Sequence, residues 1–244
     1  MSLYVMSDLH LSENADKSMD VFGHRWSGYT DKIRRNWCAV INDDDTVIIP
    51  GDISWASSLE DSLADLLFIE SLPGRKLIGK GNHDFWWSTL TKIKAFFEAN
   101  GIKSIDILYN NAYELDDYIV CGTRGWFNDE KQQNTVGDPD YDKIVAREAN
   151  RLEISLKEAK ALQEKAAYPK PILVFLHFPP VWSNFVCREI IDILKSYDIK
   201  KCYFGHIHGN YYVPRTTNFE GIDFVITSAD YLQFSPMPIW PEYE

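Results

Sequence analysis

The sequence predicts an α/β fold, because short apolar runs alternate along the chain with amphipathic helical patterns. The runs are rich in Val, Ile, Tyr and Phe, a composition typical of buried strands. Five of the runs end shortly before a polar block that contains His, Asp or Asn. Open α/β sheets place their binding sites at the carboxyl ends of strands, so we expect the five blocks to meet at one edge.

The predicted strands that precede the polar blocks cover residues 3–6, 46–49, 76–78, 172–176 and 202–204. Further strands are predicted at 118–122, 211–213 and 222–227. Helical patterns cover residues 61–72, 89–99, 141–165 and 189–197. The tail from 234 to 241 contains three prolines and is predicted to be irregular.

Length and charge limit the class of protein. A chain of 244 residues fits one domain, and we expect a single domain over residues 1–244. The net charge of -11 argues against a protein that binds the phosphate backbone of nucleic acids. It leaves open a small phosphorylated substrate, because local metal charge can outweigh the global charge.

The sequence also predicts a cellular location. No basic region and no long apolar region precedes the first polar block, and no apolar run is long enough to span a membrane. The four cysteines form no CxxC pair, so we expect reduced thiols rather than a zinc ribbon or a redox motif. We therefore expect a cytoplasmic protein without membrane contact.

The polar blocks contain five of the six histidines, together with carboxylates and an amide. These are ligands for hard to borderline divalent metals. Residues two apart on an extended strand point the same way, so each His or Asp pair with that spacing can reach one ion. The predicted metal ligands are Asp8, His10, Asp52, Asn82, His177, His206 and His208.

Seven ligands suffice for two ions with four protein ligands each if Asp52 is shared between them. Two ions about 3.5–4 Å apart generate hydroxide near neutral pH and hold a phosphoryl group for in-line attack. The sequence therefore predicts hydrolysis of a phosphomonoester or phosphodiester by a hydroxide that bridges the ions. No covalent phosphoenzyme is expected.

Two residues of the third block are left over as catalytic candidates. His83 lies beside Asp84, and an imidazole next to a carboxylate is typical of a general acid oriented by its partner. We assign His83 to protonate the leaving oxygen. Asp84 is predicted to hold the tautomer of His83 and to raise its basicity.

The ordered blocks Asp-x-His, Gly-Asp, Gly-Asn-His-Asp, His and Gly-His-x-His resemble those of the calcineurin-like metallophosphoesterase superfamily, from residue 8 to residue 208. The resemblance implies a four-layer α-β-β-α sandwich with two mixed sheets packed face to face. It also implies a dinuclear centre of Mn, Fe, Zn or similar ions. By motif, Asp8, His10, Asp52 and His208 would hold one ion, and Asp52, Asn82, His177 and His206 the other.

Differences between these blocks and the motifs of known subfamilies limit the subfamilies to which the chain could belong. The third block ends in Asp84 rather than Glu, and no Asp-Arg-Gly follows the second block, so protein phosphatase activity is not expected. Trp55 stands where purple acid phosphatases carry a ligating Tyr. The chain looks closest to small bacterial phosphohydrolases and to class III phosphodiesterases.

Three residues near the blocks are candidates for substrate contact. Trp86 and Trp126 could stack on a flat group at the mouth of the site, whereas most aromatic residues of these loops are expected to pack in the core. Arg124 follows a strand and could either bind a phosphate or form a surface ion pair. The polar segment 128–140 is either an ordinary surface loop or a mobile loop near the site.

Three alternative functions remain. A non-catalytic scaffold is disfavoured because none of the ligands is missing. A repair-type nuclease is disfavoured because the chain is acidic and leaves no room for a second domain after Gly209. A cyclic-nucleotide or other nucleotide phosphodiesterase differs only in its substrate, and the sequence leaves it open.

Overall fold

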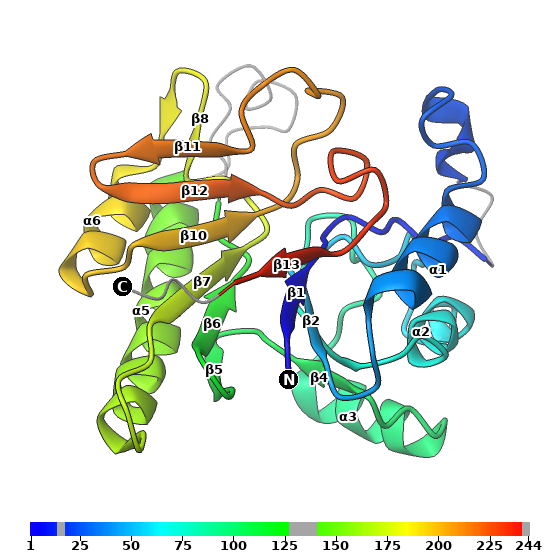
Figure 1. Ribbon diagram of the computed structural model, residues 1–244, viewed down its shortest axis with the longest axis horizontal. Coiled ribbons are helices and arrows are strands. Elements are labelled where there is room, and N and C mark those ends of the chain that lie inside the picture. The colour runs from blue at the N-terminus through cyan, green and yellow to red at the C-terminus, as the bar shows by residue number, and fades with distance from the viewer. Residues whose placement is uncertain (14–17, 127–140, 241–244) are drawn as a thin grey trace.

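Two mixed β-sheets form the centre of the computed structural model, which describes residues 1–13, 18–126 and 141–240 (Figure 1). The first sheet has the order β13 (Met237–Ile239), β1 (Leu3–Val5), β2 (Thr46–Ile49), β3 (Arg75–Ile78) and β4 (Ile105–Ile107). The second has the order β11 (Thr216–Phe219), β12 (Ile222–Ile226), β10 (Lys201–Phe204), β7 (Ile172–Leu176), β6 (Ile119–Thr123) and β5 (Asn111–Glu114). In these two sheets only the edge strands β13, β11 and β5 run antiparallel to their neighbours within the described ranges.

Helices cover the outer face of each sheet (Figure 1). Three lie on the first sheet: α1 (Tyr29–Val40), α2 (Leu63–Glu70) and α3 (Leu90–Ala99). Two lie on the second sheet: α5 (Tyr141–Lys165) and α6 (Arg188–Ser196). A short 3-10 helix, η1 (Met19–Phe22), precedes α1, and a small hairpin joins β8 (Val181–Trp182) to β9 (Phe185–Val186).

Alternation along the strands shows how the layers are packed. In β2, Val47 and Ile49 belong to the core under α1–α3, whereas Ile48 belongs to the core between the sheets. In β7, Val174 likewise packs under the helices and Phe175 packs between the sheets. Strands buried on both faces read as continuous apolar runs, which explains why their positions could be predicted. The predicted four-layer α-β-β-α sandwich is confirmed.

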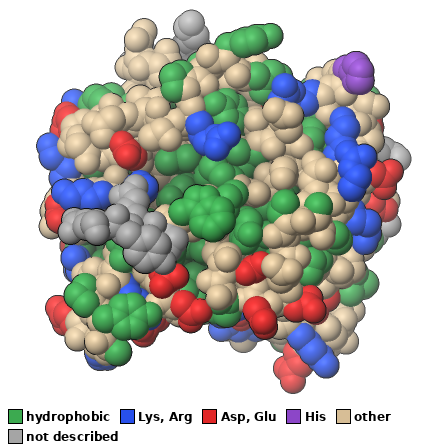
Figure 2. Space-filling view, viewed as in Figure 1, with side chains coloured by type: hydrophobic (Ala, Val, Ile, Leu, Met, Phe, Trp, Pro, Cys, Tyr) green, Lys and Arg blue, Asp and Glu red, His purple; other side chains and the backbone are tan. Residues whose placement is uncertain are grey.

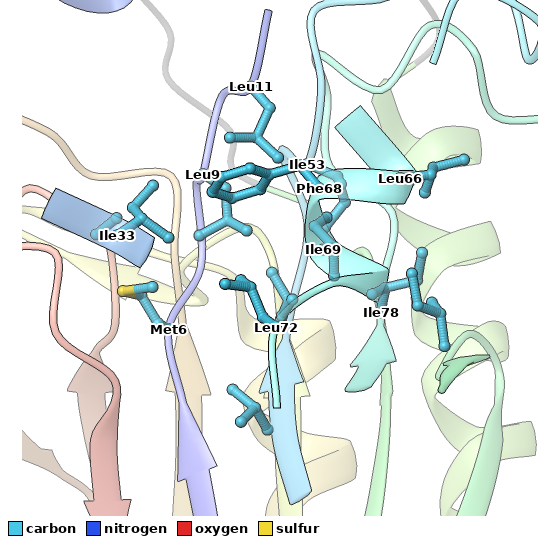
Figure 3. Packing of buried hydrophobic residues seen from close by; sticks show 14 of the residues in the cluster. Met6, Leu9, Leu11, Ile33, Ile53, Leu66, Phe68, Ile69, Leu72 and Ile78 are labelled. Carbon is cyan, nitrogen blue, oxygen red and sulfur yellow. The ribbon is translucent and has the colours of Figure 1, made fainter. Parts of the chain in front are cut away.

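The core under α1 and α2 also anchors the first polar block. Leu9 and Leu11 alternate with Asp8 and His10, and both leucines are fully buried. Figure 3 shows them beside Phe68 of α2. Burying apolar side chains on either side of His10 fixes the backbone that carries the polar ones, so the core positions this block.

Most of the predicted elements agree with the structure. The predicted strands 46–49 and 172–176 and the predicted helix 141–165 have the observed bounds, and most other elements differ by one or two residues. The strand predicted at 211–213 is wrong: this segment is a turn, and Tyr212 is fully exposed. Tyr211 and Val213 on the other side of the run are only half-buried, and the segment pairs with no strand of the described residues.

Several elements were not predicted, namely η1, α1 and the strands β4, β5, β8, β9, β11 and β13. The tail was expected to be irregular, yet β13 pairs with β1 and includes Pro238. A proline can lie in an edge strand because its missing N–H removes no bond that a central strand would need. Helix α1 places Tyr29, Ile33 and Trp37 on one buried face at a spacing of four residues.

Within the described ranges, no helix is both long and apolar enough to cross a membrane.

Candidate metal centre

The two sheets meet where β1 ends. The amide of Ser7 donates to the carbonyl of Thr227 after β12 (2.8 Å), and the amide of Ala229 donates to the carbonyl of Ser7 (2.9 Å). One step further, the amide of His206 after β10 donates to both carboxylate oxygens of Asp8 (3.0 Å each). These bonds join the carboxyl ends of strands from both sheets, as was predicted for the polar blocks.

One group of predicted ligands converges on the side of β1. The Nε2 atoms of His10 and His208 lie 3.2 Å apart. The Nε2 of His208 is 3.3 Å from Oδ1 of Asp8, and the Nε2 of His10 is 3.6 Å from Oδ2 of Asp52. The ligand atoms of Asp8, His10 and His208 therefore all lie within 4.8 Å of one another, and Asp52 adjoins this group through His10.

A second group adjoins the first. Oδ1 of Asn82 lies 2.7 Å from Nε2 of His177 and 3.1 Å from Nδ1 of His206. Nε2 of His177 is also 3.5 Å from Oδ2 of Asp52, the same oxygen that faces His10. The two groups therefore meet at one carboxylate oxygen.

The backbone reaches this arrangement through left-handed conformations rather than through extended strands. Asp8, His10, Asp52 and His206 have φ angles of 60°, 47°, 52° and 68°. Such angles are uncommon outside glycine and concentrate at functional sites. The prediction that His206 and His208 point the same way is wrong, because the left-handed turn at His206 sends these two imidazoles to different groups.

Burial and mutual repulsion dominate the electrostatics of the carboxylates. Asp8 and Asp52 are both almost fully buried. Burial, followed by the charges of Asp8 and Asp84, raises the pKa of Asp52 well above its usual value. Burial also opposes the ionisation of Asp8, but His208 and the other nearby imidazoles lower its pKa overall. Two buried carboxylates side by side call for a cation between them.

Burial favours the neutral form of three of the four imidazoles, the form in which histidine binds a metal. Burial lowers the pKa values of His10 and His177 well below the usual value, and it lowers the pKa of His206 to about 4. His208 differs: burial lowers its pKa, but Asp8 and Asp230 outweigh this and raise it to about 10. Carboxylate, amide oxygen and imidazole atoms that face one another at 2.7–3.6 Å suit divalent cations in both donor type and spacing.

Comparison with known proteins agrees with this site. Residues 1–210 match the calcineurin-like phosphoesterase family. The chain belongs to that family. The resemblance noted in the motifs is thereby confirmed, and the protein is a metal-dependent phosphoesterase. No curated protein is similar enough to count as a match.

Solved structures share the fold of this phosphoesterase. A phosphopantetheinyl hydrolase from Mycobacterium tuberculosis is 14% identical, with a TM-score of 0.55 and coverage of 100% of this chain and 98% of that one. The protein TT1561 of Thermus thermophilus is 14% identical, with a TM-score of 0.53 and coverage of 94% and 89%. A protein of unknown function from Aquifex aeolicus is 15% identical, with a TM-score of 0.51 and coverage of 97% and 95%. At such identities the likeness extends to the fold alone.

Asp84 occupies a different place from the one predicted. Its buried carboxylate accepts hydrogen bonds from the amides of Asp52, Ile53, Ser54 and Gly81 and from the indole of Trp86, at 2.7–3.2 Å. The side chain therefore ties the second block to the third instead of orienting the His83 ring. The cause is the turn after β3, where Asp84 points inward while its neighbour stays partly exposed.

His83 lies at the edge of the ligand groups. Its amide donates to Oδ1 of Asp52 (2.8 Å), and its ring is 4.2 Å from the ring of Trp55, centroid to centroid. Trp55 also stacks on His10 at 5.0 Å. The indole thus lies against both imidazoles, a position in which it can orient His83.

The prediction that Trp86 contacts the substrate is wrong. Only 2% of its surface is exposed, and its indole is bound to Asp84. Its place is in the core under α1–α3, because the buried carboxylate needs a donor there. Trp126 is partly buried and lies 5.5 Å from the ring of Phe178, which in turn contacts His206.

Arg124 takes part in an ion pair. Its Nη2 is 3.3 Å from Oε1 of Glu148, an oxygen that also accepts from Arg151. A surface ion pair is one of the two roles predicted for Arg124 from the sequence. Glu148 is fully buried, so the observed pair lies inside the protein instead. The backbone carbonyl of Arg124 accepts a hydrogen bond from the amide of His177 (3.0 Å), which places Arg124 next to the second ligand group.

The segment 128–140, for which a mobile loop was one of two predicted alternatives, lies outside the described residues.

Asp230 is a residue of the site that sequence reasoning missed. Its Oδ1 lies 2.8 Å from Nδ1 of His208, and its Oδ2 accepts from the amide of Gly209 and the hydroxyl of Tyr211. The carboxylate fixes the ring of His208 with Nε2 toward His10. It follows β12 closely, so the rule that polar residues after strands form the site could have found it.

Replacing Asp230 by Asn should weaken metal binding about 10–100-fold, the usual effect of losing a carboxylate behind a ligating histidine. The reason is that a neutral amide cannot polarise the His208 ring as a carboxylate does. Metal titration of the variant, with Asp223→Asn on β12 as the control, measures this. Equal affinities would show that Asp230 only holds the turn.

Proposed function

We propose that this phosphoesterase hydrolyses a small phosphorylated molecule, a monoester or a diester, at a centre of two divalent ions. One ion would be held by Asp8, His10, Asp52 and His208. The other would be held by Asp52, Asn82, His177 and His206. The observation that carries the proposal is the position of Asp52 Oδ2 between the Nε2 atoms of His10 and His177. When bound, two such ions supply a water-derived nucleophile near neutral pH and stabilise charge on phosphoryl oxygens.

The residues of the chain complete this chemistry. His83 is the proposed general acid, because it lies at the rim of the ligand groups and is held by the ring of Trp55. Asp84 acts as a positioning residue, since its hydrogen bonds hold the backbone that carries Asp52. Arg124 and Trp126 remain proposed contacts for the phosphoryl group and for a flat part of the substrate.

An activity screen tests the proposed function directly. The protein loaded with Mn would be assayed on aryl phosphomonoesters, aryl phosphodiesters, nucleotides and cyclic nucleotides. Phosphopantetheine would be included because one structural relative is a phosphopantetheinyl hydrolase. We expect turnover with two ions bound per chain. A protein that binds two ions and cleaves none of these esters would count against the proposal.

Replacing His83 by Gln should lower kcat while leaving two ions bound, since this side chain is not among the proposed ligands. General acid catalysis contributes roughly 10²–10⁴-fold, mostly for leaving groups that need a proton. We therefore expect a large loss on an alkyl phosphate and a small one on p-nitrophenyl phosphate. Equal losses on both esters would refute the role of His83.

A further inference from the structure

A pocket of about 540 Å³ opens between α1 and the turn at Gln233 and Phe234. Its lining is mostly basic: His24, Arg25, Lys32 and Arg35, together with Asn36. The volume is sufficient for a small ligand or for one end of a larger one. None of these residues is among the predicted metal ligands, catalytic residues or substrate contacts.

The positive charges of this pocket are not neutralised by ion pairs. Among the residues that the structure describes, Arg25, Lys32 and Arg35 have no carboxylate oxygen within 4.0 Å. The carboxylate of Asp20 interacts only weakly with Lys32, because its two oxygens accept from the hydroxyl of Ser18 and the amide of Gly28. On the face shown in Figure 2, Lys and Arg side chains gather along the edge where α1 lies. In a chain with a net charge of -11, such an excess points to an anionic ligand.

Two of the cations are held in place by backbone carbonyls. Nη1 of Arg25 donates to the carbonyl of Asp230 (2.7 Å), and its guanidinium lies 3.7 Å from the ring centre of Tyr211. Nζ of Lys32 donates to the carbonyl of Arg25 (2.7 Å). A guanidinium has five donors and an ammonium three, so both keep donors for a ligand while their orientation is fixed.

The opposite wall is a strained turn. Gln233 and Phe234 have φ angles of 55° and 59°, which is rare for consecutive residues with large side chains. Nδ2 of Asn36 donates to both of their carbonyls (3.2 Å each), so α1 holds the turn. Backbone strain of this kind persists where the surroundings over-determine it, and it concentrates at binding sites.

The pocket lies close to the candidate metal centre. The ring of Trp26 is 5.1 Å from the ring of Phe234 and 5.6 Å from the ring of His208, between centroids. Asp230 links the two sites as well, because its carbonyl binds Arg25 and its carboxylate binds His208. One indole ring therefore separates the wall of the pocket from a proposed metal ligand.

We infer that this pocket, lined by Arg25, Lys32 and Arg35, is an anion site that takes a phosphate group. The nearest source of such a group is a second phosphate on the substrate that the metal centre cleaves, an assignment that rests on the proposed function. A phosphorylated molecule with two separated phosphates would then be preferred to a simple aryl phosphate. Free inorganic phosphate is the other source with the same chemistry.

Calorimetric titration of the metal-loaded protein with inorganic phosphate tests the anion site without relying on turnover. The test variants are Arg35→Gln, whose side chain is exposed, and the double variant Lys32→Gln/Arg35→Gln. The control is Arg34→Gln, which removes one positive charge from α1, as Arg35→Gln does, but lies over Phe68 and contacts Ser71 instead. We expect the double variant to bind one equivalent of phosphate fewer than the control. Equal stoichiometry in the two would overturn the inference.

Kinetics then identify the source of the phosphate. If the substrate supplies it, the double variant should lose about tenfold or more in kcat/KM on a bisphosphorylated substrate relative to its loss on p-nitrophenyl phosphate, mainly through KM. An equal loss on both esters overturns the assignment to the substrate and leaves free phosphate as the ligand. If the wild type cleaved none of the esters, the proposed function would be contradicted. The calorimetric result would still decide whether the anion site exists.

Discussion

Replacing Asp52 by Asn should remove both ions and nearly all activity. The single oxygen Oδ2 of Asp52 faces His10 on one side and His177 on the other, so both proposed ligand groups depend on it. An amide oxygen is a weaker ligand without a full charge, and it bridges two cations poorly. Losing about 4 kcal/mol of transition-state stabilisation corresponds to roughly a thousandfold in rate, and we expect at least that loss in kcat/KM.

Metal content and activity must be measured together on this variant. The control is Asp106→Asn, which removes a half-exposed carboxylate from the edge strand β4, where it is paired with Arg75. Circular dichroism would show whether both variants fold. If the Asp52 variant kept two tightly bound ions, the shared-ligand arrangement would be wrong.

The position of the site could be predicted from the sequence because of one regularity. Each buried parallel strand is an apolar run, and the polar residues after it lie at the same edge as those after its neighbours. Asp52 after β2 and His177 after β7 are separated by about half of the chain, yet their side chains lie 3.5 Å apart. Burial on both faces made the strands recognisable in the sequence. The parallel arrangement of neighbouring strands then brings the residues that follow them to one edge.

The local geometry could not be predicted in the same way. Periodicity describes extended strands and helices, whereas Asp8 and His206 adopt left-handed conformations that depend on tertiary hydrogen bonds such as the one between them. The role of Asp84 was missed for a related reason, because its donors include amides 30 to 32 residues away in the chain. Trp86 looked like a surface contact only because its buried partner is not evident from sequence neighbours.

A second large effect is expected from a much smaller change, Gly81→Ala. The backbone of Gly81 has an ordinary φ angle, so alanine would be allowed there in an isolated chain. A methyl group would, however, lie 2.0 Å from Oδ1 of Asp52 and 2.3 Å from its amide nitrogen. These atoms belong to the proposed shared ligand and to the backbone that carries it, so the clash can be relieved only by moving the metal centre.

The expected result is loss of metal and of activity by about a hundredfold or more, because displacing a reacting group by about 1 Å can reduce the rate by that factor. Gly79→Ala is the matched control: it is two residues away, has an ordinary φ angle, and would place its methyl group no closer than 3.3 Å to another atom. Metal titration and kcat/KM would be measured for both variants. Similar behaviour of the two would mean that the loop after β3 can shift without moving Asp52, and the close approach would then not constrain the site.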